Sequence, residues 1–266
     1  MDRKPWQLEI VGKSLKKKEK LGLLTAGLAL SPEDVALDLG CAQGMLSYFL
    51  RRAGGSWVSA DQDWTNLETT RALVGSGLVQ VEPVRLPFRS GAFDLVALPD
   101  YLEHVDDDRG LLGEIARILA PGGRLIVVVP QTGRHHRLHR LKAALGMRLE
   151  FYGHKREGYA RRELDGLLGR AGFRPLAHRS YARAFSEFFE LVLNLVYTRF
   201  LKPESSESLR DGHIRPTTGG EFSARRPAFR LYAIVYPFVW LASQLDHLLF
   251  FLEGNSLIVW AKKLTP

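Results

Sequence analysis

The chain has 266 residues, of which 45% are hydrophobic and 25% are charged, and its formal net charge is +8 at pH 7. This composition excludes a disordered or fibrous chain and is typical of a globular protein with a sizeable core. The single cysteine, Cys41, excludes an intramolecular disulfide. The positive charge favours an anionic partner, such as nucleic acid, acidic lipid headgroups or an acidic small molecule.

The N-terminal residues 1–32 form a basic segment, "MDRKPWQLEIVGKSLKKKEK" and its continuation, for which we predict helical structure. The segment lacks the apolar stretch and small-residue cleavage site of a signal peptide. We therefore expect a cytoplasmic protein, with peripheral binding to a membrane as an open alternative.

Short apolar runs alternate with helical patterns from residue 33 to about residue 130. The runs predict strands over 34–40, 56–63, 77–84, 93–100 and 124–130, with helices over 45–54, 66–77 and 111–123 between them. A further helix over 160–173 precedes a sixth strand over 174–182, and a seventh strand is predicted over 255–263. Alternating strands and helices of these lengths predict an α/β fold whose parallel, doubly wound sheet is covered on both faces.

Residues 183–254 are predicted to be an insertion between the sixth and seventh strands, so the main domain comprises residues 33–182 and 255–266. Two apolar helical segments in the insertion flank a polar stretch rich in Pro, Gly and Ser, which we expect to be a flexible loop over about 203–227. In the first helix the polar residues lie on one narrow face: Glu187, Glu190, Asn194 and Thr198. The rest of its surface is apolar and is expected to be covered.

The second apolar segment is too interrupted to predict a membrane span. Its apolar run from Leu231 to Ala242 contains Pro237 and is followed by Asp246 and His247, whereas a span needs about 20 apolar residues with few charges. Three alternatives remain: a hydrophobic lid, a helix that lies in the membrane interface, and plain core packing.

The turn "DLGCAQG" follows the first predicted strand and opens a helix. Such a turn presents backbone N–H groups to a ligand, and Gly40 and Gly44 permit close approach. Glycines spaced as in Gly40-Cys41-Ala42-Gln43-Gly44 do not match the G-x-G-x-x-G fingerprint of dinucleotide sites. Asp61, at the end of the second strand, could accept hydrogen bonds from ribose hydroxyls. A nucleoside without phosphates fits both observations.

Four stretches in this order resemble class I S-adenosylmethionine-dependent methyltransferases: "DLGCAQG", "SADQD", "RLPFRSGAFDLVALPDYLEHV" and "EIARILAPGGRLIVVVP". The resemblance covers residues 33–130 and, more loosely, residues 153–182 and the final strand. It implies a Rossmann-like, seven-stranded mixed sheet with the last strand antiparallel. It also implies S-adenosyl-L-methionine as cofactor. The residues that it places at the cofactor are Asp38, Gly40, Cys41, Ala42 and Gly44 in the turn, Asp61 and Gln62 at the ribose and adenine, Glu82 near the adenine, and Leu98 and Pro99 beside the methionine part.

Two residues depart from the family pattern. Ala42 occupies a position where glycine is common, and alanine is expected to be tolerated there if its φ is negative. Pro83 follows Glu82 where the family often donates a backbone N–H to adenine, and proline has no N–H.

The sequence assigns no catalytic residue and no metal ligand. Asp100 and His104 are candidate general bases, but each is as readily explained by capping or packing. His135, His136 and His139 are interleaved with arginines in "RHHRLHR", which favours a basic surface over a metal site.

Three functions are compatible with these patterns. The first is methylation of a lipophilic or membrane-associated small molecule, such as a quinone precursor, a lipid or a lipid-linked glycan. The second is methylation of RNA or DNA, although "LPDY" at residues 98–101 differs from the Asp/Asn-Pro-Pro-Tyr motif of many such enzymes. The third is a non-catalytic protein of the same fold that docks on membranes. The acceptor atom and the oligomeric state stay open.

Overall fold

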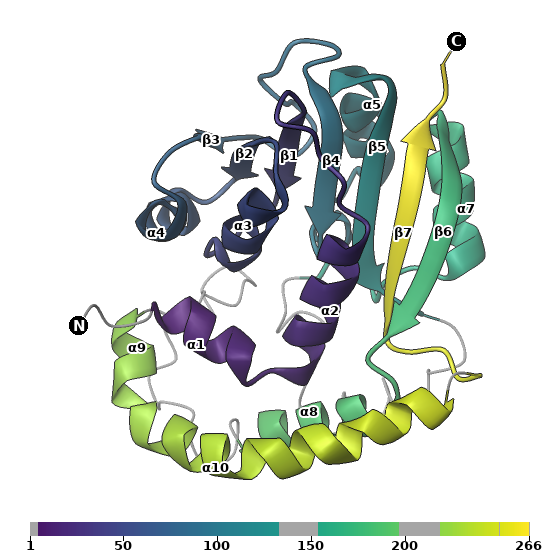
Figure 1. Ribbon diagram of the computed structural model, residues 1–266. Helices are drawn as coiled ribbons and strands as arrows, with labels where there is room; N and C mark the ends of the chain where they lie inside the picture. Colours follow the sequence, from purple (N-terminus) through teal and green to yellow (C-terminus); the bar gives the residue numbers. More distant parts are fainter. Residues whose placement is uncertain (1–4, 133–153, 197–218, 250, 266) are drawn as a thin grey trace.

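The computed structural model describes residues 5–132, 154–196, 219–249 and 251–265, and a single seven-stranded sheet forms the centre of the molecule (Figure 1). The strand order is β3-β2-β1-β4-β5-β7-β6, with β7 antiparallel to both of its neighbours. The predicted α/β class and mixed sheet are thereby confirmed. The strands have these bounds: β1 Val35–Leu39, β2 Ser56–Asp61, β3 Leu78–Gln80, β4 Phe93–Pro99, β5 Leu119–Pro130, β6 Phe173–Tyr181 and β7 Ser256–Lys263.

The first strand, β1, lies in the middle of the sheet, and the order in which strands are added reverses between β1 and β4. The chain builds β1, β2 and β3 outward and then returns to pair β4 with the free side of β1. In open parallel sheets, ligands bind at the carboxyl ends of strands beside such a switch point. The fold therefore places the predicted turn, just after β1, where a ligand is expected.

Helices cover both faces of the sheet. On one face, α5 and α7 supply leucines and isoleucines to a core that includes Leu37, Val96 and Val127. On the other face, α2 and α3 pack through Leu24, Leu46 and Leu50. The helices have these bounds: α1 Trp6–Gly12, α2 Leu15–Ala26, α3 Met45–Leu50, α4 Trp64–Val74, α5 Asp108–Ile118, α7 Arg161–Arg170, α8 Ala184–Val196, α9 Gly219–Ala224 and α10 Arg226–Ser243, with the short 3₁₀ helices η1 Arg51–Ala53, η2 Leu102–His104 and η6 Gln244–Leu249.

Two predicted boundaries are wrong. Helix α5 ends at Ile118 rather than at 123, since Pro121 disfavours helical geometry at Ala120 and the chain joins β5 at Leu119. The third strand covers only residues 78–80 of the predicted 77–84, because the chain turns back at a bridge between Glu82 and Arg85, around Pro83.

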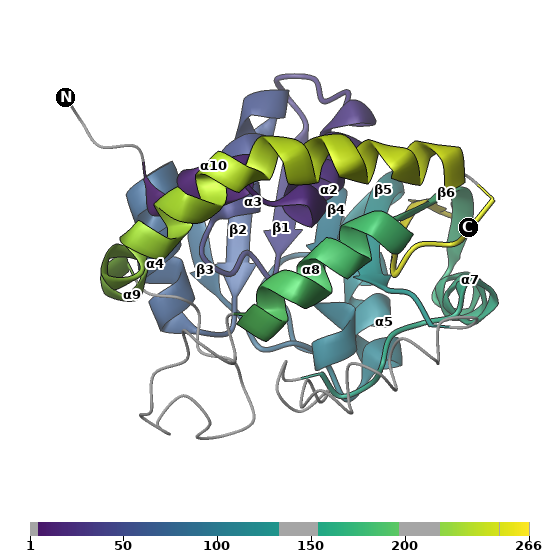
Figure 2. The same cartoon turned by 90° about the horizontal axis from the view of Figure 1, so that it is seen from below.

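The N-terminal helices and the insertion lie together along the carboxyl edge of the sheet (Figures 1 and 2). Helices α8 and α10 occupy the two apolar segments of the sequence. Residues 219–224 and 226–227, predicted as part of the loop, are instead helical, and Pro227 in the first turn of α10 is well suited to a helix start. Residues 203–218 of the predicted loop lie outside the described residues.

Both insertion helices turn their more polar faces inward. On α8, Glu187 is buried, while Phe188 and Val192 are exposed. On α10 and η6 the buried positions are Tyr236, Ser243 and Asp246. The large apolar side chains of this stretch point outward, with Ile234 69% and Phe238 70% exposed; the others are Leu231, Val235, Trp240, Leu241, Leu245 and Leu248. We call this surface of α8, α10 and η6 the apolar face.

The expectation that the apolar surface of α8 is covered is therefore not met within the described residues. No helix in the described part of the chain is long and apolar enough to cross a membrane.

Asp246 joins the two halves of the insertion. Its Oδ1 accepts a hydrogen bond from the Phe185 N–H at 2.9 Å, and its Oδ2 accepts one from the Ser186 N–H at 2.9 Å. The carboxylate of η6 thus caps the first turn of α8, where negative charge also meets the positive end of the helix dipole.

Replacing Asp246 with alanine is expected to lower the free energy of unfolding by about 1–2 kcal/mol, because two helix-terminal N–H groups lose their acceptor. Hydrogen exchange should accelerate in α8 more than in β1 or β4. Asp246→Asn, which keeps one acceptor oxygen, should fall between the two. Equal exchange in Asp246→Ala and the parent chain would contradict the assigned cap.

Candidate active site

The turn after β1 is fixed to β2 by its own backbone. The N–H groups of Gly40 and Cys41 both donate to the Ala60 carbonyl, at 2.8 and 3.0 Å. Gly40, Ala42 and Gly44 all have positive φ, at 83°, 47° and 78°. The condition of a negative φ at Ala42 is therefore not met, and a left-handed alanine costs about 1–2 kcal/mol.

Neighbouring side chains leave no room for larger residues in this turn. A Cβ on Gly40 would lie 2.4 Å from the Tyr101 ring, and one on Gly44 would lie 2.8 Å from the Thr70 backbone. The Thr70 hydroxyl donates to the Ala42 carbonyl at 2.9 Å. The glycines are thus required both by their backbone conformation and by close approach.

Asp61 links the end of β2 to this turn. It is 4% exposed. Its Oδ2 accepts from the Ala42 N–H at 2.8 Å, and its Oδ1 accepts from the Asp63 N–H at 2.9 Å and from Asn66 Nδ2 at 3.1 Å. A carboxylate offers about four acceptor positions, so Asp61 retains capacity on Oδ2 for a ligand hydroxyl.

Several buried polar atoms around the turn have no hydrogen-bond partner among the described residues: Asp38 Oδ1, Asn66 Oδ1 and the Tyr101 hydroxyl. Unpaired buried polar atoms are costly, and a polar ligand could satisfy them. Asp38 is fully buried at the end of β1, and burial raises its pKa to about 6, although a hydrogen bond from the Ser47 hydroxyl opposes this shift. This donor and acceptor set fits an adenosine that carries a cationic amino-acid chain.

The other predicted cofactor residues lie around the same edge of the sheet with less direct geometry. Cys41 is buried in the turn, where burial raises its thiol pKa. Gln62 is exposed, and its carbonyl accepts from Gln80 Nε2 at 3.0 Å. Glu82 is exposed beyond β3. Leu98 is fully buried in the core beside α5, and Pro99 ends β4.

Charged side chains from α2, from α8 and from the residue just after β4 meet at this edge, and their grouping was not predicted from the sequence. The Lys20 ammonium pairs with Asp100, and the Lys16 ammonium lies 3.8 Å from Glu187 Oε1. Burial opposes ionisation of Asp100, but Lys20 lowers the pKa of this carboxyl on balance. Burial and the neighbouring Asp100 raise the pKa of Glu103 to about 8. One carboxyl of this pair is therefore ionised at neutral pH, and the other is largely protonated.

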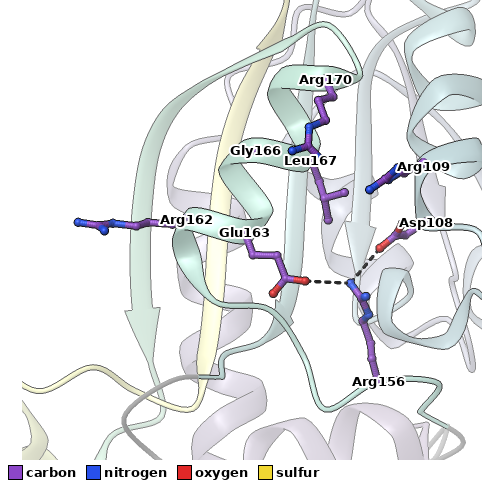
Figure 3. A pocket seen from close by; sticks show the side chains of 8 residues that line it. All are labelled: Asp108, Arg109, Arg156, Arg162, Glu163, Gly166, Leu167 and Arg170. Atoms are coloured by element: carbon purple, nitrogen blue, oxygen red, sulfur yellow. Dashed lines mark hydrogen bonds and ion pairs between the residues drawn. The ribbon is translucent and has the colours of Figure 1, made fainter.

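Two cavities lie elsewhere. The first, of about 240 Å³, lies between α5 and α7 and is lined in part by Arg109, Arg156 and Arg170, whereas the Arg162 side chain is directed away from Arg156 (Figure 3). The second, of about 610 Å³, adjoins Gln131, Thr132 and Arg161. No residue of the β1 turn lines either cavity. Arg156, Arg161 and Arg162 thus line these cavities beside α7, whereas His135, His136 and His139 lie outside the described residues.

Comparison with known proteins identifies the region that holds this turn. The family model described as "Methyltransferase domain" matches residues 37–127. These residues form a class I S-adenosylmethionine-dependent methyltransferase domain. A solved S-adenosylmethionine-dependent methyltransferase from Methanosarcina mazei has the same fold, with a TM-score of 0.55, 15% sequence identity, and 92% of this chain and 98% of that one covered.

Two curated relatives are similar to the methyltransferase domain. A demethylmenaquinone methyltransferase from Mycolicibacterium vanbaalenii is 36% identical over 100 residues, which are 38% of this chain and 43% of that protein. A ubiquinone biosynthesis O-methyltransferase from a Caulobacter species is 34% identical over 97 residues, which are 34% of this chain and 38% of that protein. The chain thus spans less than half of the length of either relative, and the insertion is not part of the family match.

Asp61→Ala is expected to weaken S-adenosylmethionine binding by about 2 kcal/mol, roughly 30-fold, because charge-assisted hydrogen bonds to the ligand and to the Ala42 N–H are lost. Calorimetric titration measures this change. Asp63→Ala is the matched control, since it removes a neighbouring exposed carboxylate and keeps the N–H that Asp61 binds. Similar affinities for both variants would count against Asp61 as a ligand residue.

Binding should also depend on pH through Asp38. Its pKa of about 6 means that the unliganded carboxyl is protonated below that pH, and a cationic ligand nearby would favour the carboxylate. Affinity for S-adenosylmethionine should therefore rise as the pH increases through 6, by up to about tenfold per pH unit below the pKa, and level off above it. In Asp38→Asn this dependence should be absent; a parallel slope in that variant would assign the titration to another group.

Proposed function

We propose that this protein transfers a methyl group from S-adenosylmethionine to a lipophilic small molecule taken from a membrane surface. The cofactor, when bound, supplies a methyl already activated on a positively charged sulfur. The residues of the chain need mainly to align the acceptor and exclude water. The observation that carries the acceptor class is that the helices bearing the apolar face lie along the carboxyl edge of the sheet, the edge at which the candidate cofactor turn lies (Figure 1).

The cofactor would be held by the β1 turn and by the carboxylates at the ends of β1 and β2. The positive-φ backbone of the turn allows close approach, Asp61 offers an acceptor to ribose hydroxyls, and Asp38 offers one to a cationic group. Tyr101 lies against Gly40 and would form part of the wall. Asp100 directly precedes Tyr101 in the sequence and pairs with Lys20. As an ionised carboxylate, it can accept a proton at a carboxylate oxygen.

A lipid surface explains why α8 and α10 expose their apolar sides. Burying each large apolar side chain contributes about 1.5–3 kcal/mol, and a row of them on one face matches an interfacial helix. Lys13 and Lys18 lie over the Tyr236 ring, at 5.0 and 5.6 Å, and so bring basic charge beside α10. Positive charge at the border of an apolar face is complementary to anionic headgroups. The two relatives named for quinone biosynthesis act on acceptors of a compatible class.

The acceptor class can be tested with methyl-tritiated S-adenosylmethionine and vesicles that contain a demethylated quinol or a total lipid extract. The label should enter the organic-solvent phase, and the Asp61→Ala variant should transfer at least tenfold less. Label found instead in added RNA, with none in the lipid phase, would overturn the proposed acceptor while leaving the methyltransferase activity intact.

The membrane contact has its own test. Phe238→Asp combined with Leu241→Asp should reduce flotation with anionic vesicles by at least tenfold, because two exposed apolar anchors are lost. The control is Leu176→Asp combined with Leu264→Asp, which alters two leucines outside the insertion that are also more than half exposed. If both double variants float like the parent chain, the apolar face does not contact lipid.

A further inference from the structure

Three potential metal ligands meet beside the candidate active site. Glu103 and His104 belong to η2, directly after β4, and His154 precedes α7. Their ligand atoms all lie within 4.8 Å of one another. The two imidazole rings are 4.8 Å apart between centroids and nearly perpendicular, at 83°. Two histidines and one glutamate form a known ligand set for catalytic zinc, which leaves a position open for water or substrate.

Glu103 is hard to explain as an ordinary core residue. It is 1% exposed, and its Oε2 has no hydrogen-bond partner in the described part of the chain. The nearest lysines are engaged elsewhere, since Lys20 pairs with Asp100 and Lys16 faces Glu187. A buried carboxyl oxygen without a partner is costly, and a cation beside it would favour the ionised carboxylate and remove that cost.

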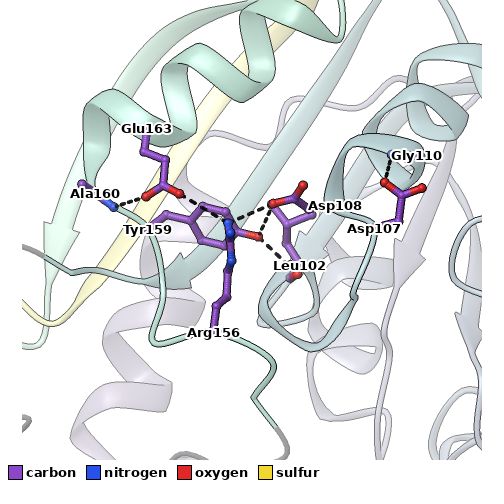
Figure 4. Close-up of polar contacts among 8 residues, drawn as sticks. All are labelled: Leu102, Asp107, Asp108, Gly110, Arg156, Tyr159, Ala160 and Glu163. Carbon is purple, nitrogen blue, oxygen red and sulfur yellow. Dashed lines mark hydrogen bonds and ion pairs between the residues drawn. The ribbon is translucent and has the colours of Figure 1, made fainter.

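Contacts made by the residues that follow His154 hold this segment against η2, independently of any contact between the three side chains. The Lys155 N–H donates to the Glu103 carbonyl at 2.9 Å. Arg156 stacks on the Tyr159 ring at 4.4 Å and bonds Asp108 at 2.9 Å (Figure 4). The Tyr159 hydroxyl lies 3.2 Å from the same Asp108 carboxylate and 3.3 Å from the Leu102 carbonyl.

These contacts therefore tie the segment that carries His154 to both η2 and the start of α5. Ligand atoms around a tetrahedral zinc ion, with bonds of about 2.0–2.1 Å, are separated by roughly 3.3–3.5 Å. Binding of zinc would therefore require the three ligand atoms to come closer than the 4.8 Å within which they now lie.

The cluster lies close to the candidate cofactor turn. The Tyr101 ring packs on Gly40, and η2 begins at the next residue. Asp100, three residues before Glu103, directly follows β4 at the edge where the methyl acceptor is expected. A metal ion here would be adjacent to the acceptor rather than to the cofactor's adenosine.

We propose that Glu103, His104 and His154 bind one divalent transition-metal ion of the zinc type. The ion keeps at least one coordination position for water or for an oxygen atom of the methyl acceptor. The role toward the acceptor rests on the proposed function, whereas the binding of the ion does not. A metal next to a hydroxyl lowers the pKa of that hydroxyl and so favours its nucleophilic form.

The test is a titration of the full-length, tag-free protein, first stripped with a chelator, with Co²⁺ and then with Zn²⁺. One Co²⁺ per chain should bind with visible ligand-field bands, and Zn²⁺ should displace it. Glu103→Gln and His154→Ala should each weaken Co²⁺ binding by more than about 100-fold, since loss of a ligand exceeds the 10–100-fold effect of losing an outer partner. Circular dichroism confirms that each variant is folded.

The control variant replaces His135, His136 and His139, the other histidine group in the sequence, with alanine and should bind Co²⁺ like the parent chain. The proposal is overturned if the folded parent chain binds no Co²⁺, if His154→Ala binds it normally, or if the triple variant loses it. Calorimetry with S-adenosylmethionine on the same samples separates the two hypotheses. Metal binding without cofactor binding would refute only the proposed function, and the reverse would refute only the metal site.

Discussion

The bond from the Ala42 N–H to Asp61 joins the two parts on which the active site depends. It connects a turn with three positive-φ residues to the carboxylate at the end of the neighbouring strand. Parallel pairing of β1 with β2 brings the ends of both strands to one edge of the sheet, so residues about 20 positions apart in the sequence become neighbours. The same carboxylate accepts the Ala42 N–H and retains a lone pair for a ribose hydroxyl. The geometry of the turn and its preference for a ligand therefore depend on one side chain.

Charge is arranged differently on the two sides of the insertion helices. Toward the sheet, Glu187 and Asp246 meet lysines and helix N–H groups, so polar contacts hold α8 and η6 in place. Away from the sheet, the apolar side chains of α10 are exposed. Attachment by polar contacts frees the apolar sides for an external partner, which is the reverse of the usual helix on a globular core. A lipid surface at this face would bring an apolar acceptor to the edge where β1 and β4 end.

Much of the fold could be predicted because apolar runs of strand length alternate with helical patterns, and a parallel sheet follows from that alternation. The proximity of the turn to Asp61 could be predicted because the carboxyl ends of neighbouring parallel strands meet at one edge of the sheet, whereas their role as a ligand site stays a prediction. The inward orientation of Glu187 and Asp246 could not, because periodicity defines the faces of a helix without saying which one is buried. The grouping of Glu103 and His104 with His154 was missed for a different reason. Fifty residues separate them, and contacts made by residues after His154, such as Lys155 and Arg156, hold the two segments together. The positive φ of Ala42 could not be predicted either, because alanine rarely adopts the left-handed conformation.

The central claim is that the β1 turn and the end of β2 together bind an adenosine that carries a sulfur-linked amino acid. The most direct measurement is an NMR titration of ¹⁵N-labelled protein with S-adenosylhomocysteine, the demethylated form of the cofactor. If these residues bind the ligand, the largest changes in amide chemical shift should fall on Gly40–Gly44 and on Asp61–Asp63, with smaller changes at Tyr101. Saturable shifts confined to other parts of the chain, with these amides unmoved, would contradict the central claim.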